Sequence, residues 1–173
     1  MSGLIRNLLT LLAALRHYRS AGLQSRTALH FRITPFDTGL ATLKSDRYLQ
    51  MAEAAQLDYG IKTGLLGDML RRRCSFVNAS QLVRFARPVR LFNRVAVATQ
   101  VIHADSKCAY FHHVFSVGAS VHAEVFVKMK FKQGRLTVNP ADMLGAFDGA
   151  KPALLQHWDQ TLASDVPAAS GSH

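Results

Sequence analysis

Apolar and polar residues alternate in several segments of this chain, which is the pattern of half-buried β-strands. The first segment is residues 28–34, Ala-Leu-His-Phe-Arg-Ile-Thr, which Pro35 closes. Four longer segments follow, at about residues 73–86, 91–104, 108–117 and 120–132. Because short connections join them, we expect neighbouring strands to pair in antiparallel fashion.

One segment has a helical period instead and separates the first strand from the others. Ser45 is the expected N-cap of a helix over residues 45–63, and Gly64 is its expected C-cap. Its apolar residues form two stripes on nearly opposite sides, one of Tyr48, Met51, Ala52, Ala55 and Tyr59 and the other of Ala54, Leu57 and Ile61. A helix that is apolar on two sides is enclosed on two sides. The pattern therefore predicts an α+β fold in which a curved antiparallel sheet wraps around one long central helix.

The two ends of the chain lie outside this pattern. In residues 1–20, leucines at helical spacing predict an amphipathic helix that packs on the domain or a dimer mate, or lies on an anionic membrane. Its apolar run is too short to span a bilayer, and no small-residue cleavage site follows it. We expect the main domain at residues 27–146 and a helical tail at residues 147–173, the last residues of which fray.

Composition and charge narrow the class of protein. A chain of 173 residues is long enough for one domain, and 49% apolar with 18% charged residues is typical of a folded protein. The two cysteines are far apart, as in a reduced cytoplasmic protein. The net charge of +10 attracts anions, such as acidic membranes or ligands that carry phosphate. The basic residues are scattered and no nucleic-acid motif accompanies them, so nucleic acid is not an expected partner.

The loop before the helix and the helix itself carry a motif. Residues 34–65 resemble the 4-hydroxybenzoyl-CoA thioesterase family, in which D-x-D-x-x-G-H-x-N-N-x-x-Y-L leads into a helix that ends near Gly-Leu. The matching positions are Arg47-Tyr48-Leu49, Ala54-Ala55, Tyr59, Ile61-Lys62 and Gly64-Leu65, and the later strands are similar at Phe85, Pro88, Val95, Val97, Thr99 and Val101. The similarity is strongest to a bacterial branch related to the membrane-associated thioesterase superfamily member six.

This resemblance implies a hotdog fold and an acyl-CoA thioesterase-like hydrolase. It implies an acyl-CoA or acyl carrier substrate, a homodimer or dimer of dimers with the substrate between subunits, and no bound cofactor. The implied location is cytoplasmic, with peripheral contact at the inner membrane as a further expectation. In the family the oxyanion donor is a backbone N–H at the start of the central helix, which corresponds here to Ser45.

The sequence departs from the family at the active site. The catalytic Asp position falls on Thr38, with Asp37 one residue earlier, and the usual His and paired Asn fall on Thr42, Lys44 and Ser45. The alternative is therefore a catalytically degenerate hotdog protein that binds acyl-CoA or lipid without hydrolysis. Binding at the membrane surface is a further form of this alternative.

Three carboxylates are candidates for the catalytic group. Asp37 comes first, although an Asx-turn is an equally good reading of its sequence context. Glu53, two turns into the helix, comes second, with a buried structural role as the alternative. Asp58 comes third because pairing with Lys62 at the i+4 position explains it better.

Several further residues are candidates for substrate binding. Thr38 and Thr42 have hydroxyls that can orient water or substrate, or can serve in turns. Lys44 and Tyr48 complete the expected site around Ser45. The ladder of Lys128, Lys130 and Lys132 on the last strand is either a site for the phosphates of coenzyme A or a solvated face, and Arg71, Arg72 and Arg73 are a second phosphate candidate. His122 and Glu124 share a face but lack further ligands at suitable spacing, so no metal site is expected.

Overall fold

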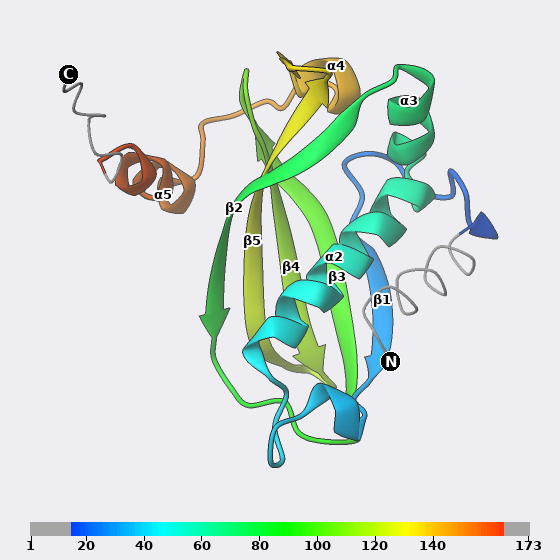
Figure 1. Cartoon of the computed structure of the whole chain (residues 1–173), viewed down its shortest axis with the longest axis vertical. Coiled ribbons are helices and arrows are strands. Elements are labelled where there is room, and N and C mark those ends of the chain that lie inside the picture. The colour runs from blue at the N-terminus through cyan, green and yellow to red at the C-terminus, as the bar shows by residue number, and fades with distance from the viewer. Residues whose placement is uncertain (1–14, 165–173) are drawn as a thin grey trace, which may run out of the picture.

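The computed structural model describes residues 15–164 (Figure 1). Residues 1–14, with most of the predicted N-terminal helix, and residues 165–173 of the tail lie outside the described residues. The strands are β1 (Thr27–Arg32), β2 (Ser75–Phe85), β3 (Arg94–Ala104), β4 (Ala109–Val117), β5 (Ser120–Gln133) and β6 (Leu136–Val138). The helices are α2 (Ser45–Lys62), α3 (Leu65–Arg71), α4 (Ala141–Leu144) and α5 (Ala153–Ser164). No helix within residues 15–164 is long and apolar enough to cross a membrane.

The strands form one antiparallel sheet in the order β1-β3-β4-β5-β2, and β6 pairs with β5. Short connections join β3 to β4 and β4 to β5, so the predicted antiparallel pairing is confirmed. The β2 strand lies at one edge because it pairs with β5 but with no second strand of the described chain. The five strands predicted from alternation are all present, whereas β6 was not predicted.

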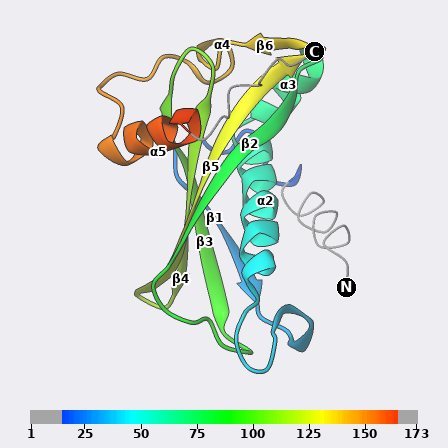
Figure 2. The same cartoon turned by 60° about the vertical axis from the view of Figure 1, so that its left-hand side comes forward.

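Helix α2 crosses the concave face of this sheet, as Figures 1 and 2 show. The ring of Tyr48 packs on Phe115 of β4 with 5.3 Å between centroids, and Tyr59 meets Phe111 edge-on at 5.4 Å. Both predicted apolar stripes are buried except for Leu57, which is partly exposed. The predicted central helix is therefore confirmed, and it is fixed on the sheet near both of its ends.

The ends of α2 differ in part from the prediction. The N-cap is Lys44, not Ser45, and no side chain caps the first turn. Ser45 is instead the first helical residue, because the backbone of Lys44 is still extended (φ −71°, ψ 148°). At the other end the C-cap is Thr63, not Gly64. Gly64 follows it with φ +77°, a left-handed conformation that favours glycine and ends the helix. A further short helix, α3, follows immediately and was not predicted.

Residues before β1 cover the C-terminal end of α2. The amides of Arg19 and Ala21 donate to the carbonyls of Ile61 and Lys62, at 3.3 and 3.0 Å. These carbonyls belong to the last turn, beyond which the helix supplies no i+4 donor. The Ile61 carbonyl also accepts from the Gly64 amide, and the segment adds its own two hydrogen bonds at that end of the helix. The hydroxyl of Tyr59 also donates to the carbonyl of Leu23.

Helix α5 lies on the opposite face of the sheet from α2 (Figure 2). Leu155 and Trp158 are buried there against a cluster that includes Cys108, Tyr110 and Phe126. The tail that the sequence predicts as helical is thus helical at Ala153–Ser164 and docks on the sheet.

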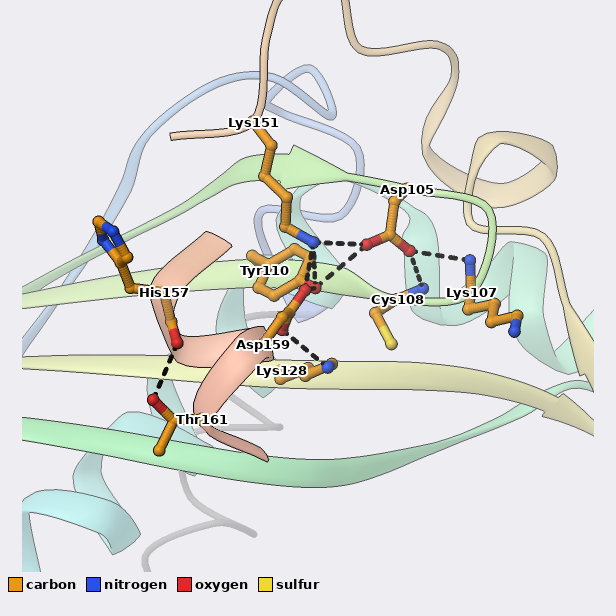
Figure 3. Close-up of polar contacts among 9 residues, drawn as sticks. All are labelled: Asp105, Lys107, Cys108, Tyr110, Lys128, Lys151, His157, Asp159 and Thr161. Atoms are coloured by element: carbon orange, nitrogen blue, oxygen red, sulfur yellow. Dashed lines mark hydrogen bonds and ion pairs between the residues drawn. The ribbon is translucent and has the colours of Figure 1, made fainter. Parts of the chain in front are cut away.

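An ionic network fastens α5 to the sheet (Figure 3). Lys151 Nζ lies 2.8 Å from Asp105 Oδ2 and 2.5 Å from Asp159 Oδ2, and it also donates to Tyr110 Oη at 2.6 Å. Lys128 Nζ donates to the other oxygen of Asp159 at 2.8 Å. Although partial burial alone would raise the pKa of Asp105, hydrogen bonds from Lys151 and two backbone amides outweigh it and lower this pKa to about 2.

We predict that acid releases α5 and that Lys151→Met makes the release easier. The pKa of Asp105 is about 2 when α5 is docked, against an ordinary 3.8, so the released state binds more protons below about pH 4 and is favoured by acid. Without the Lys151 ammonium, the pKa of Asp105 in the docked state rises toward its ordinary value. Docking of α5 is then weaker already at neutral pH, and Asp105 contributes less to its further weakening in acid. Trp158, the one tryptophan of the chain, reports release by a red shift of its fluorescence.

Lys107→Met is the matched control for this prediction, because Lys107 is exposed and lies beside the same loop. Its pH profile should follow that of the wild type. A Lys151→Met profile identical to that of the wild type would show that the network does not hold α5.

Candidate functional site

A recess lies between α2 and the edge strand β2. Glu53, Gln56 and Leu57 line it from the helix, and Phe76 and Asn78 line it from the strand. We call it the Glu53 recess. Gln56 Nε2 donates to Asn78 Oδ1 at 3.3 Å across it, so the two elements are linked at this level. Glu53 is solvent-exposed, and the recess therefore presents an accessible carboxylate beside an amide pair.

A second recess, the apolar recess, adjoins the first and shares Gln56, Leu57 and Phe76 with it. Its remaining lining residues are Gly60 of α2, Leu65, Leu66 and Met69 of α3, and Phe111 and Met129 of the sheet. The two recesses together follow one face of α2, because Glu53, Gln56, Leu57 and Gly60 have the i, i+3, i+4, i+7 spacing of a helical face.

A third recess lies at the start of α2. Thr42, Ser45 and Tyr48 line it from the helix side, and Phe85, Arg87 and Pro88 lie opposite. The first N–H groups of a helix have no intrahelical partner, and the positive end of the macrodipole lies here. The Ser45 amide is one of these groups because Ser45 is the first helical residue. This N-terminal recess can therefore stabilise an oxyanion.

Asp37 does not line any of these three recesses. It ends the 3-10 turn Pro35–Asp37 and is buried. Its Oδ2 accepts from the backbone N–H of Thr34 at 3.1 Å and from the Thr34 hydroxyl at 2.7 Å. This arrangement is a capping box and not the Asx-turn of the alternative prediction, but in both the role of Asp37 is structural. Its carboxylate orders the loop before α2.

The other predicted residues of this loop have separate places. Thr38 is buried, and its hydroxyl donates to the Pro35 carbonyl at 3.2 Å, which is a turn hydrogen bond. Thr42 is exposed in the N-terminal recess, and its backbone forms an isolated antiparallel β-bridge with that of Arg90. Lys44 is exposed at the N-cap of α2. Tyr48 is a core residue, and burial raises the pKa of its hydroxyl despite a backbone hydrogen bond at Val89.

The predicted phosphate ligands lie away from these recesses. Lys128 and Lys130 alternate with the core residues Val127 and Met129, so they belong to the face of the sheet that α5 covers. Lys128 is already bonded to Asp159. The sheet separates this ladder from the Glu53 recess, so nothing in the geometry of that recess supports a phosphate role for Lys128 and Lys130.

Arg71, Arg72 and Asp58 have local partners. Arg71 pairs with Asp68, and Arg72 donates to the Asp142 carbonyl at 2.8 Å. The predicted pair of Asp58 and Lys62 is confirmed at 2.7 Å. No group of side chains within residues 15–164 has the composition of a metal site.

Sequence reasoning missed Gln56, Asn78 and Phe76. Neither an amide nor an aromatic residue at a single position forms a motif, and β2 joins the recess only through its pairing with β5. The one signal present in the sequence is that Gln56 follows Glu53 by three residues and therefore shares its helical face.

Comparison with known proteins places this geometry in a family. A family model described as the thioesterase-like superfamily matches residues 40–147. Among solved structures, a probable thioesterase from Bartonella henselae is similar with a TM-score of 0.60 and 16% identity, over 66% of this chain and 98% of that one. The 4-hydroxybenzoyl-CoA thioesterase from Pseudomonas sp. strain CBS-3 has a TM-score of 0.60 and 16% identity, over 68% and 96%.

A third solved structure, the DHNA-CoA thioesterase from Staphylococcus aureus, covers more of the chain. Its TM-score is 0.58 at 12% identity, over 80% of this chain and 91% of that one. No curated protein matches the sequence significantly. Structural similarity at identities this low supports the fold alone. The fold is the α+β hotdog fold that the sequence predicts.

We predict that Asp37→Ala lowers the free energy of unfolding by about 1 kcal/mol, the usual cost of a lost cap. The substitution removes the acceptor of both Thr34 hydrogen bonds. Urea denaturation measures the change, and Asp148→Ala, at an exposed position, is the control. Equal stability of the two variants would contradict the capping role.

Proposed function

This chain belongs to the thioesterase-like superfamily, and we propose that it hydrolyses the thioester of an acyl-CoA or acyl carrier substrate with Glu53 as its catalytic carboxylate. One observation carries the choice of residue. Glu53 is an exposed carboxylate in a recess, whereas Asp37 is buried and is hydrogen-bonded to Thr34. This reverses the order of the two candidates that the sequence gives.

The chemistry needs a carboxylate and an oxyanion donor. In the proposed reaction Glu53 takes a proton from water, the oxygen of which attacks the thioester carbonyl carbon. The C–S bond then breaks, Glu53 returns the proton to the leaving thiolate, and the products are a carboxylic acid and the free thiol. The backbone N–H of Ser45 is the proposed donor to the carbonyl oxygen as its negative charge develops. A backbone donor does not depend on the side chain at this position, so it is retained where the family has a different residue.

The spacing of these two groups supports a homodimer. Eight residues of helix separate Ser45 from Glu53, which at 1.5 Å per residue is about 12 Å. One thioester cannot contact both groups of the same subunit at that separation. We therefore propose that the Ser45 amide of one subunit acts with Glu53 of the other.

The edge strand β2 is the proposed contact between the subunits. Its ladder groups are unpaired on one side within the described chain, and Phe76, Val77 and Phe85 expose apolar side chains there. These residues adjoin both the Glu53 recess and the N-terminal recess. Pairing along β2 would cover them and bring the recesses of two subunits together.

Basic residues at the N-terminal recess suit the phosphates of coenzyme A. Arg87 lines this recess, Arg90 pairs with Thr42 in a backbone β-bridge, and Lys44 is the N-cap of the helix. All three side chains are exposed. They replace Lys128 and Lys130 as the proposed phosphate ligands, since they lie on the same side of the molecule as the oxyanion donor.

The second candidate function is binding of acyl-CoA or lipid without hydrolysis. It is favoured by the replacement of the family's catalytic residues with Thr38, Thr42 and Lys44, and by the capping role of Asp37. Turnover of the wild-type protein on acyl-CoA substrates decides between the two functions.

We predict that Glu53→Gln lowers kcat for acyl-CoA hydrolysis by about 10²- to 10⁴-fold, the usual contribution of a general base. Asp37→Asn should retain most of the activity, because an amide oxygen can still accept from Thr34. Release of free thiol across short, aromatic and long acyl-CoAs measures both. Asp46→Asn, an exposed carboxylate on the same helix, is the control. Loss of activity in Asp37→Asn but not in Glu53→Gln would refute the assignment.

We predict that Ser45→Pro lowers kcat by about 10²-fold or more, because it deletes the backbone N–H. Proline is tolerated at the first helical position, and the extended conformation of Lys44 suits a residue that precedes proline. Ser45→Ala keeps the N–H and should remain active.

Mixed dimers test whether the site is shared. When the Glu53→Gln and Ser45→Pro proteins are unfolded together and refolded, a mixed dimer has one site with both groups intact. Recovery of activity above that of either variant is expected. Mixed dimers that remain inactive would contradict a site built from two subunits.

A further inference from the structure

We propose that two loops at the start of α2 form a surface that inserts into an anionic membrane. The first loop, residues 34–44, precedes α2, and the second, residues 88–93, belongs to the connection from β2 to β3. Both lie at the lower end of the molecule in Figure 1, where α2 begins. We call them together the loop surface. The inference goes beyond the proposed function, because contact with a membrane needs neither a thioester nor a catalytic group.

Backbone hydrogen bonds hold the two loops side by side. The Leu91 amide donates to the Ala41 carbonyl at 3.0 Å. The Phe92 amide donates to the Ile33 carbonyl at 3.1 Å, and the Ile33 amide donates to the Asn93 carbonyl at 3.0 Å. The second loop is thus bonded to both ends of the first, and their side chains form one continuous surface.

Three large apolar side chains project from these loops into solvent. Phe36 is 71% exposed, Phe92 is 63% exposed and Leu40 is fully exposed. None of the three belongs to the buried clusters of residues 15–164. Folding therefore gains little from their apolar area, and apolar side chains gathered at one place on a surface mark a site of interaction.

The backbone at Phe92 is unfavourable for phenylalanine. The Asn93 amide donates to the Arg90 carbonyl at 3.2 Å, which closes a four-residue turn with Phe92 at its third position. The φ of Phe92 is +65°, a conformation that favours glycine or asparagine in turns and is rare for a bulky residue. Neither the turn nor the core accounts for a phenylalanine here, so its ring points to a contact outside the chain.

The loop surface is also basic. Residues 32–47 and 87–94 together contain six arginines and lysines and two aspartates. Of the aspartates, Asp37 is buried and hydrogen-bonded, and Asp46 lies 3.7 Å from Arg47. The exposed cations are Arg32, Lys44, Arg87, Arg90 and Arg94. A bilayer with anionic lipids matches both properties, because it offers negative headgroups and a hydrocarbon layer directly below them.

The loop surface adjoins the N-terminal recess. Thr42 lines this recess, and its backbone pairs with that of Arg90 in the second loop. Insertion of the loops therefore brings the recess to the level of the lipid headgroups. A ligand with a hydrocarbon tail and a phosphate-bearing head collects at the same level of a bilayer.

Binding of the full chain to mixed phosphatidylserine–phosphatidylcholine vesicles tests the apolar part of the surface. Leu40→Ser/Phe92→Asn should bind about tenfold more weakly than the wild type or less, because both side chains lose their burial in hydrocarbon. Its melting temperature should not fall, since asparagine accepts the φ of position 92. The control is Leu70→Ser/Leu136→Ser, which replaces two comparably exposed leucines of α3 and β6 at the opposite end of the molecule and should bind like the wild type.

Arg32→Gln/Arg94→Gln tests the charge of the same surface. Binding to the mixed vesicles should weaken by about fivefold for each arginine removed. Arg73→Gln/Arg135→Gln, at two exposed positions of the opposite end, has the same net charge and should bind like the wild type. This pair separates contact at the loops from the general attraction of a chain with a net charge of +10.

Equal binding of Leu40→Ser/Phe92→Asn and its leucine control would overturn the proposal, as would a wild type that does not bind the mixed vesicles. Loop variants that change the oligomeric state but not vesicle binding would also overturn it, because the loops then contact a second copy of the chain. The assay contains no thioester, so a chain that binds through the loops without hydrolysing acyl-CoA supports this inference while refuting the hydrolase.

Discussion

The packing of α2 across the concave face of the sheet is the constraint on which the rest of the structure depends. Tyr48 and Tyr59 lie three turns apart and contact Phe115 and Phe111 of the same strand, β4. Two such contacts fix the rotation of the helix as well as its direction. Glu53, Gln56 and Gly60 must then face the β2 edge, and the N-terminal amides must open onto the loop of Thr42. The position of the proposed site is therefore determined by the orientation of α2 on the sheet.

The two faces of the sheet are used differently, and this explains where the charged residues lie. The concave face is closed by α2 and has its recesses along one side of the helix. The opposite face carries the lysines of β5, of which Lys128 neutralises Asp159 beneath α5. The pairing of Lys151 with both Asp105 and Asp159 serves the docking of the tail in the same way. The positive net charge of the chain therefore does not locate a phosphate site. Some of its lysines are already paired with carboxylates, and the sequence does not say which.

The sequence predicts the fold well because each element has a strong local signal. Alternation identifies β1 to β5, and the double stripe of the central helix implies enclosure before any contact is known. Helix α3 and strand β6 are short, with seven and three residues, so a periodic pattern has no room to develop in them. The site is predicted less well. Ser45 and Glu53 are recognisable from their positions on the helix, whereas Phe76 and Asn78 reach the recess through strand pairing that no local pattern encodes. Alternation predicts that the lysines of β5 share a face, but it does not predict which face lies toward α2.

The loop before α2 explains how the active-site residues of the family can be replaced here while the proposed chemistry is kept. The capping box of Thr34 and Asp37 and the turn hydrogen bond of Thr38 hold this loop so that Lys44 leads into the helix in an extended conformation. A loop held in this way needs its side chains for structure, and those side chains are then not available for catalysis. The helix start still presents a backbone N–H, and the next turns still present a carboxylate at a defined distance. In the proposed site both groups come from α2, the amide from one subunit and the carboxylate from the other. The loop therefore has only to direct the helix, and Thr42, Lys44 and Ser45 can differ from the family without removing either group.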